Sequence, residues 1–391
     1  MLAPREAIEL RHGGPAVAPA RLSRRRKIGF GVLALHLSLG LALGLGELLV
    51  RLTSPQDLSG TWREYSSGGY LMNKASGTAR HQSGKRLVHY RFNDQHLRAA
   101  PLAAESAKTT RVLALGDSFT FGWLLDEPDS YVGQLQARAD AALGPGKVEL
   151  LNGAAGGWGT EEYTAFLEDY GASIRPHVVL VFIGVDDTER AKQGQLFRLS
   201  DPSQLELRRT GQRAPESRLK RLANAFPGYQ FLLEHSHLLQ LLRQFSLRAQ
   251  LGAWNAADRP QAPAVIPSVA PDDPAVLKEN ALLLRIAAWC RKHGTTLLVV
   301  TNWPVDAKYT PVLPERNQHN LAFRAQAAQF LGARGIPFFD AGPAIGTQIG
   351  DDLDTYVIKN DSHPTETGAK AIAEAIWPWL EPRLREAVAA R

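Results

Sequence analysis

The stretch RVLALGDSFTFG, residues 111–122, constrains what this chain can fold into more than any other segment. A short apolar run, Val112 to Leu115, ends in Gly116, and an acid, Ser118 and a turn of small residues follow at once. If the run is a parallel strand, Ser118 lies at its carboxyl end, where open α/β sheets bind their ligands. A serine in that position can use backbone N–H groups to stabilise an oxyanion. The alternative is an ordinary strand-to-helix turn in which the serine caps the next helix.

From residue 111 onward, short apolar runs alternate with helical patterns. The runs VVLVFIG and TTLLVV are apolar throughout, which is typical of strands buried on both faces of a parallel sheet. Alternation of this kind predicts a doubly wound α/β fold with a parallel five-stranded sheet and right-handed crossovers. The expected strands are 111–115, 147–151, 178–183, 296–301 and 336–339. The expected helices are about 129–143, 160–172, 276–293, 317–333 and 365–387.

Residues 189–275 interrupt this alternation, because they are too many for an ordinary connection between the third and fourth strands. The middle of the insertion, FLLEHSHLLQLLRQFSL, has the pattern of an apolar helix, and its end is rich in proline and alanine. We expect a helix packed over the sheet edge plus a loop, with a lid or a partner surface as the alternative. His235 and His237 lie two apart on that helix and so on different faces, which argues against a metal site there.

The N-terminal part of the chain has the pattern of a membrane anchor. Five basic residues between Arg21 and Lys27 precede an apolar run of 19 residues, Ile28 to Gly46, which is close to the span of a bilayer. The basic cluster predicts a cytoplasmic N-terminus, with everything after Glu47 outside the cytoplasm. A cleaved signal peptide is the competing interpretation, but no Ala-x-Ala site follows and the leader is long. We therefore expect a single-pass anchor in the inner (cytoplasmic) membrane.

The predicted organisation has four parts. They are a disordered basic cytoplasmic tail (1–27), a transmembrane anchor (28–50), a juxtamembrane edge segment (51–110) and an α/β domain (111–391) that carries the insertion. The net charge of +6 lies largely in the arginine cluster, whose position before the anchor explains it, so no nucleic-acid partner is expected. The one cysteine, Cys290, cannot form an internal disulfide and lies on an apolar helical pattern, so we expect it in the core.

Polar groups follow the predicted strands at the point where each strand ends. They are Gly116-Asp117-Ser118 after the first strand, Asn152 to Thr160 after the second, Gly184-Val185-Asp186-Asp187 after the third, and Asn360-Asp361-Ser362-His363-Pro364 beyond the fifth. Because parallel strands end at the same edge of a sheet, we expect these groups to share one crevice. The set suits acyl transfer: a histidine activates the serine hydroxyl, a carboxylate holds the histidine tautomer, and glycine N–H groups bind the oxyanion.

At this point the chain resembles a known superfamily. The segments GDSFTFG, the glycine turn, GVDD and DSHPTETGAKAIAEAI are similar to the four conserved blocks of SGNH/GDSL hydrolases, over about residues 85–385 without the insertion. The resemblance implies a flavodoxin-like three-layer α/β/α fold and an esterase or acyltransferase that uses neither cofactor nor metal. It implies Ser118 as the nucleophile and His363 as the base. It also implies oxyanion donors at the N–H groups of Ser118 and Gly157.

Two positions depart from the superfamily pattern. Its third block usually reads Gly-x-Asn-Asp, and the asparagine amide donates to the oxyanion, whereas this chain has Asp186 at that position. An ionised carboxylate only accepts hydrogen bonds, so Asp186 serves the oxyanion hole only if it stays protonated or if another donor replaces it. In the last block an acid usually stands three residues before the histidine, where this chain has Asn360. We assign Asp361, two residues before, as the acid that orients His363.

Two functional hypotheses remain open on the sequence. The first is a membrane-anchored, periplasmic or otherwise extracytoplasmic serine esterase or O-acyltransferase that acts on ester groups, expected to be O-acetyl groups of envelope carbohydrates. It rests on the four blocks, the anchor and RFNDQHLR, which together are similar to bacterial envelope members, including relatives of alginate-type O-acetyltransferases. The second is a catalytically degenerate domain that serves as a binding or assembly subunit of a membrane complex. It rests on Asp186 and the long insertion.

Other interpretations are less favoured. The turn NGAAGGWGT matches neither the dinucleotide nor the P-loop phosphate motif, and no histidine pair has the spacing of a metal hydrolase. Trp158 and Trp303 could border the crevice, with ordinary core packing as the alternative. Hydrolysis and acyl transfer are both compatible with the sequence.

Overall fold

The structure, a computed structural model, describes residues 23–102, 109–210, 226, 228–245, 270–301, 314–349, 352–359, 361 and 363–391. The chain divides into two units, Met1–Ser54 and Pro55–Arg391. The first unit contains α1 (Arg24–Thr53), whose N-terminus is capped by Ser23. By length and composition α1 can cross a membrane, with a mean hydropathy of 2.0 over 18 residues and none of that stretch buried. The finer division into tail, anchor and juxtamembrane segment stays a prediction.

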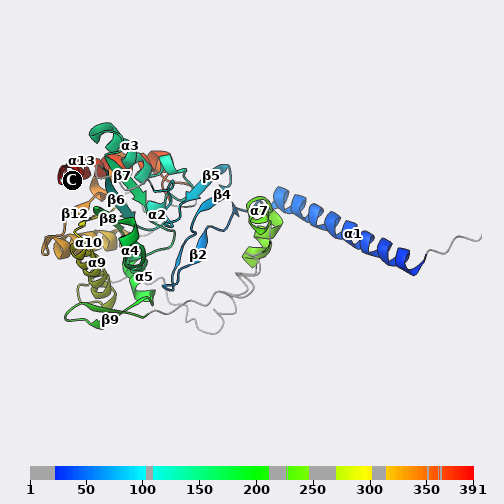
Figure 1. Cartoon of the computed structure of the whole chain (residues 1–391), viewed down its shortest axis with the longest axis horizontal. Coiled ribbons are helices and arrows are strands. Elements are labelled where there is room, and N and C mark those ends of the chain that lie inside the picture. The colour runs from blue at the N-terminus through cyan, green and yellow to red at the C-terminus, as the bar shows by residue number, and fades with distance from the viewer. Residues whose placement is uncertain are drawn as a thin grey trace, which may run out of the picture. The chain divides into compact units, whose positions relative to one another are not determined.

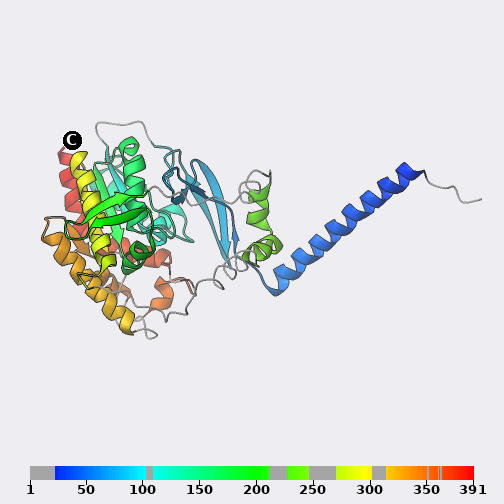
Figure 2. The ribbon, with the colours of Figure 1, turned by 90° about the horizontal axis from the view of Figure 1, so that it is seen from below.

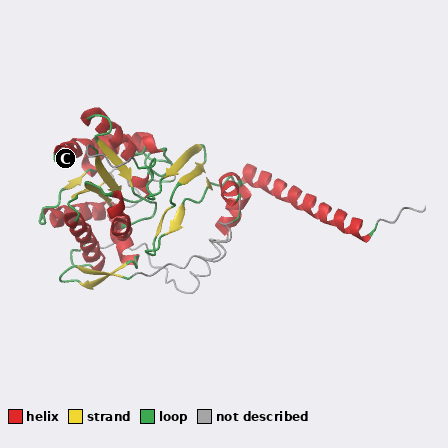
Figure 3. Ribbon diagram, in the orientation of Figure 1, coloured by secondary structure: helices red, strands yellow, loops and turns green. Residues whose placement is uncertain are grey.

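The second unit is built on a five-stranded sheet in which every pairing is parallel (Figures 1 and 3). Its strands, in spatial order, are β12 (Phe338–Asp340), β11 (Thr296–Thr301), β8 (Val178–Ile183), β6 (Thr110–Leu115) and β7 (Val148–Asn152). In chain order the strands lie 2-1-3-4-5, which is the flavodoxin-like order. The predicted α/β class is confirmed, and the bounds of β8 and β11 are those expected from their apolar runs.

Helices cover both faces of this sheet. One layer holds α4 (Thr160–Ile174), α9 (Pro274–Lys292) and α10 (Pro314–Gly332). The other holds α3 (Tyr131–Leu143), α11 (Gly342–Ile349) and α13 (Glu366–Ala389), with the short α12 (Leu353–Tyr356) packed on α13. The helices expected from the sequence are present, with ends that differ by a few residues.

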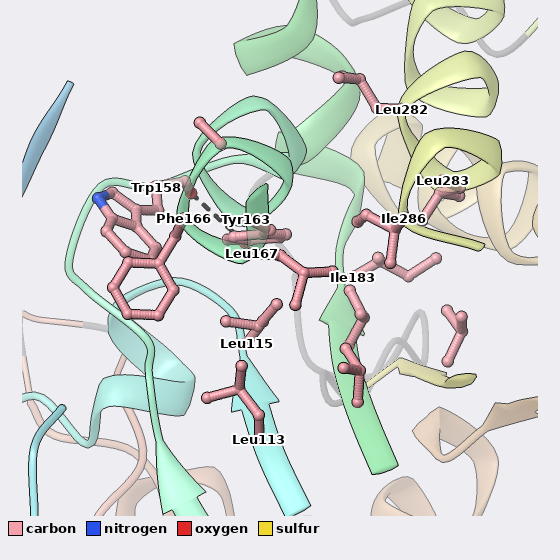
Figure 4. Close-up of a cluster of buried hydrophobic side chains, with 14 of the residues drawn as sticks. Leu113, Leu115, Trp158, Tyr163, Phe166, Leu167, Ile183, Leu282, Leu283 and Ile286 are labelled. Atoms are coloured by element: carbon pink, nitrogen blue, oxygen red, sulfur yellow. Dashed lines mark hydrogen bonds between the residues drawn. The ribbon is translucent and has the colours of Figure 1, made fainter. Parts of the chain in front are cut away.

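Alternating side chains of each strand enter the two helical layers, because strand residues point to opposite faces in turn. Leu113 and Leu115 of β6 pack with Phe166 and other residues of α4 and α9 (Figure 4). Val112 and Ala114 of the same strand enter the second layer beside α3 and α13. All four side chains are fully buried, which explains why the run is continuously apolar. Cys290 is buried in the first layer, as expected.

The segment before β6, expected only as a juxtamembrane edge segment, forms two small antiparallel sheets. They consist of β1 (Leu58–Ser59), β4 (Gly77–Ser83) and β5 (Arg86–Phe92) in one sheet, and β2 (Arg63–Tyr65) and β3 (Leu71–Asn73) in the other. Trp62, Tyr90 and Phe92 form an aromatic cluster with Phe121, the residue that ends α2 (Ser118–Phe121). Figure 2 shows the strands of this segment beside the cyan ribbon that follows β6.

The insertion contributes both a hairpin and a helix. The hairpin of β9 (Phe197–Asp201) and β10 (Glu206–Arg209) was not predicted. The predicted helix is present as α7 (Tyr229–His235) and the helical residues 237–245. Gln230 and Glu234 accept hydrogen bonds from the backbone of Thr61 and Arg80. The helix therefore packs on the sheet of β1, β4 and β5, which we call the small N-terminal sheet. The Pro/Ala-rich end of the insertion lies outside the described residues.

Arg98 joins the N-terminal segment to the turn that follows the serine. Its guanidinium is fully buried and donates to the carbonyl groups of Phe121, Gly122 and Leu125. Its backbone N–H donates to the carbonyl of Asn152 at the end of β7. One side chain therefore satisfies three carbonyl groups that a tight turn would leave without partners.

We predict that Arg98→Met lowers the free energy of unfolding by about 3 kcal/mol, because three buried carbonyl groups lose charged donors. Urea denaturation of the variant measures this loss. Arg91→Met is the matched control. Arg91 lies on β5 and forms an exposed ion pair with Glu127 at 3.6 Å, so its replacement is expected to cost less than about 1 kcal/mol. Equal losses in the two variants would contradict the role given to Arg98.

Candidate active site

The turn after β6 presents Ser118 as the first residue of α2. Asp117 caps this helix by accepting the N–H of Phe119 at 2.9 Å, and Gly122 ends it in the left-handed region at φ 79°. Position 116 requires glycine, because a Cβ there would lie 1.9 Å from Thr120 Oγ1. At the first helical position the N–H of Ser118 has no intrahelical acceptor, and it makes no hydrogen bond within the described residues.

The serine, histidine and acid expected from the sequence lie together. His363 Nε2 is 2.7 Å from Ser118 Oγ, although 245 residues separate them in the chain. On the other side of the ring, His363 Nδ1 is hydrogen-bonded to Asp361 Oδ1, which also accepts the backbone N–H of His363 at 3.3 Å. Asn360, the other candidate for the acid, lies outside the described residues. The arrangement has the geometry of a general base held in one tautomer by a carboxylate.

Two aromatic rings hold the imidazole of His363 in place. The ring of Phe119 lies 4.7 Å from it and that of Trp123 5.9 Å, measured between centroids. Trp123 contacts His81 and Trp62, so the small N-terminal sheet supports the wall of the site. Burial lowers the pKa of His81 to about 4, so this second histidine is neutral at physiological pH and adds no cation beside the site.

The glycine-rich turn after β7 closes the site on the next side. Trp158 N–H donates to the carbonyl of Ala155 at 3.3 Å, and Gly157 has φ 78°, as the third residue of such a turn requires. A Cβ on Gly156 would lie 3.7 Å from Ser118 Cβ, so this turn adjoins the serine. Gly157 itself is exposed, and its N–H makes no hydrogen bond within the described residues. Trp158 is buried in the core, which favours its packing interpretation, and Trp303 lies outside the described residues.

The third turn carries Asp186 and Asp187 on α5 (Val185–Gln193), directly after β8. Asp187 is buried and accepts hydrogen bonds from Gly184 N–H at 2.8 Å and from Tyr163 Oη at 3.1 Å. It is thus a structural acid that caps its own helix. Asp186 is half-buried at the same edge of the sheet.

Arg190, one turn along α5, ties the first three turns together. It donates to Asp117 Oδ2 at 3.1 Å and to the carbonyl of Trp158 at 2.7 Å, and it lies 3.6 Å from Asp187. These contacts bring the strand ends of β6, β7 and β8 to one cation. Sequence reasoning missed Arg190. Its position three residues after Asp187 on a helix was the only available signal, and this spacing also describes an ordinary surface ion pair.

Comparison with known proteins adds to this geometry. The model of the GDSL-like lipase/acylhydrolase family matches residues 114–371, about two thirds of the chain. The chain belongs to this family. Its membership confirms the resemblance drawn from the four blocks and makes the protein a carboxylic ester hydrolase by class. No curated protein matches the chain.

Solved structures similar to this one include several esterases. TesA is 15% identical, covers 70% of this chain and 99% of its own, and has a TM-score of 0.39. Esterase EstA from Pseudoalteromonas sp. is 14% identical, covers 71% of this chain and 99% of its own, and has a TM-score of 0.40. A catalytic mutant of Axe2, an acetylxylan esterase from Geobacillus stearothermophilus, is 12% identical, covers 71% and 95%, and has a TM-score of 0.41.

The buried acids behind the third turn generate a prediction about pH. Burial raises the pKa of Glu279 on α9 to about 7, and the hydroxyl of Thr160 donates to this carboxyl at 2.7 Å. The folded state therefore keeps its proton in a range where the unfolded state has lost it. Stability from this group is present at low pH and is lost as the pH rises from about 4.5 to about 7.

We predict that Glu279→Gln stabilises the protein at pH 8 by up to about 3 kcal/mol and has little effect at pH 4.5, because glutamine keeps the hydrogen bond without the buried charge. Denaturant unfolding at a series of pH values measures this difference. Glu386→Gln, on an exposed position of α13, serves as the control and should leave the pH dependence unchanged. If Glu279→Gln keeps the pH dependence of the wild type, the prediction is wrong.

Proposed function

We propose that this chain is a membrane-anchored serine esterase or O-acyltransferase that acts outside the cytoplasm on acyl esters of envelope carbohydrates. The O-acetyl group is the acyl group we expect. The observation that carries the proposal is the 2.7 Å distance from Ser118 Oγ to His363 Nε2. On the other side of the ring, Nδ1 is hydrogen-bonded to Asp361 Oδ1. A serine hydroxyl becomes an effective nucleophile only when such a base takes its proton.

In the proposed reaction Ser118 Oγ attacks the ester carbonyl carbon while His363 Nε2 accepts the hydroxyl proton. The carbonyl oxygen becomes an oxyanion, which the N–H groups of Ser118 and Gly157 bind. The intermediate collapses, the alkoxy group leaves with the proton held on Nε2, and an acyl-serine remains. A water molecule or a sugar hydroxyl then gives its proton to Nε2 and attacks the acyl carbon. The tetrahedral intermediate releases Ser118, whose Oγ recovers the proton.

The expected location supports carbohydrate esters as substrates. An uncleaved α1 with the arginine cluster on its cytoplasmic side would tether the second unit to the outer face of the inner membrane. A domain tethered there meets the acylated glycans of the envelope. Trp123, half-buried against His363, offers an apolar surface of the kind that sugar rings pack on. Hydrolysis and transfer share the acyl-serine and differ in which hydroxyl reaches it.

Asp186 favours a second candidate function, a degenerate domain that binds or assembles partners within a membrane complex. Losing one oxyanion donor costs about 3–4 kcal/mol of transition-state stabilisation, and a carboxylate at that point adds repulsion. The long insertion would then serve as the partner surface. The two candidates differ in whether Ser118 is activated, and this can be tested directly.

We predict that a fluorophosphonate forms one covalent adduct with the full-length protein in detergent, because His363 activates Ser118 toward phosphorus as it does toward carbonyl carbon. Intact-mass spectrometry detects the adduct, and Ser118→Ala serves as the control that cannot form it. Absence of the adduct on folded wild-type protein would reject the enzyme and favour the degenerate subunit.

We predict that Asp186→Asn changes the turnover of 4-nitrophenyl acetate by less than about tenfold, because the wild-type enzyme already has a working oxyanion site. Steady-state kinetics of both proteins measure the ratio. A rise of about 100-fold or more from near-zero activity would instead show that Asp186 disables the site, as the second candidate requires.

A further inference from the structure

Arg63 is a half-buried cation that the chemistry described so far does not use. It is the first residue of β2, and its register partner on β3 is Asn73. Within the described part of the chain its guanidinium forms no hydrogen bond and no ion pair. Removing a guanidinium from water without a partner is unfavourable, so an unpaired arginine in this position needs an explanation.

The β2–β3 hairpin is bound to the glycine-rich turn. Asn73 Nδ2 donates to the carbonyl of Ala154 at 3.0 Å, and Trp158 Nε1 donates to the carbonyl of Leu71. The turn from Ala154 to Trp158 is therefore held at both ends by β3. This attachment fixes where the side chain of the neighbouring strand residue, Arg63, meets the turn.

Arg63 reaches the side of the turn that faces the nucleophile. The position of a Cβ on Gly156 would be 2.5 Å from Arg63 Nη2 and 3.7 Å from Ser118 Cβ. The guanidinium and the serine thus approach the same point beside Gly156. That residue immediately precedes Gly157, whose N–H is the second expected oxyanion donor. Any larger residue at position 156 would displace the guanidinium, so glycine keeps the space open.

The other arginines that bind the site turns have protein partners. Arg190 is paired with Asp117 and the carbonyl of Trp158, and Arg98 is bound to three carbonyl groups. Burial lowers the pKa of Arg63, but an arginine stays protonated at neutral pH. Arg63 is therefore a charged donor with free capacity next to the serine.

We propose that Arg63 is a catalytic residue that donates a hydrogen bond to the oxyanion and supplies the donor that Asp186 cannot. This inference rests on the proposed function. As Ser118 Oγ bonds to the carbonyl carbon, the π electrons move to the carbonyl oxygen, and the guanidinium gains a counter-charge only in that state. A donor that acts mainly in the transition state raises kcat more than it tightens substrate binding.

The test compares Arg63→Met, Arg63→Lys and Arg63→Ala with wild type in the full-length protein, using uncharged 4-nitrophenyl acetate. We expect kcat to fall by about 100-fold or more in the methionine and alanine variants, with KM changed less than about threefold. Lysine should restore part of the loss. Guanidinium chloride at millimolar concentration should raise the turnover of Arg63→Ala and leave Ser118→Ala inactive, which a purely structural role would not produce. Arg91→Met is the matched control and should keep wild-type kcat.

Three results would overturn the inference. Wild-type kcat in Arg63→Met, with the wild-type protein active and labelled by fluorophosphonate, would reject the role of Arg63 and leave the proposed function standing. A loss confined to KM for an anionic ester such as 4-nitrophenyl hemisuccinate would assign Arg63 to a carboxylate of the substrate instead. Absence of turnover and adduct in wild type would reject both proposals. Circular dichroism checks that Arg63→Met is folded. If it is not, the kcat of Arg63→Lys and the guanidinium rescue of Arg63→Ala test the role of Arg63 instead.

Discussion

The hydrogen bonds from Arg98 to the turn after the serine are the interaction on which the rest of the site depends. A helix of four residues directly after a buried strand leaves carbonyl groups that neither the helix nor water can satisfy. The guanidinium of Arg98 binds three carbonyl groups there, and its backbone binds the end of β7. The position of Ser118 is thus set partly by Arg98, which belongs to the segment before the first strand of the parallel sheet.

The same principle operates on the opposite side of the site. Arg190 joins Asp117, Asp187 and the carbonyl of Trp158, which belong to three different strand ends. Parallel sheets place these ends at one edge but do not fix the turns relative to one another. Charged hydrogen bonds do so here, because they tolerate little change in geometry and are strong in a buried setting. Both sets of bonds hold the turn that carries Ser118, whose Oγ lies 2.7 Å from His363 Nε2.

The sheet could be predicted from the sequence because its strands are buried on both faces. Continuous apolar runs such as 178–183 and 296–301 have no other good environment, and their bounds were therefore found to the residue. The strand ends carry the residues of the four blocks, so Ser118, His363 and Asp361 could be nominated together. Their contact depends on register and on a connection of 245 residues, which only the structure supplies.

The N-terminal sheets and the hairpin of the insertion could not be predicted for the opposite reason. Their strands are partly exposed, and a strand such as GTARHQS carries mostly polar residues. Arg63, Arg98 and Arg190 were equally hidden, since a single arginine in a sequence is typical of an exposed surface position. Arg98 and Arg190 differ from surface arginines because each binds a group far along the chain. Arg63 differs because it is half-buried without a partner among the described residues.

A site built from such arginines also accounts for the departure at position 186. An asparagine in the third turn and an arginine on β2 reach the oxyanion from different elements, and only the second brings a full positive charge. Once a cation stands beside the nucleophile, a carboxylate in the third turn no longer leaves the oxyanion facing uncompensated negative charge. Donors from several elements around the crevice can stabilise the oxyanion, so its stabilisation does not depend on the residue at position 186 alone. A sequence pattern that records single positions therefore registers Asp186 as a defect. The β2–β3 hairpin, which carries Arg63, lies before residues 114–371, the region that the family model covers.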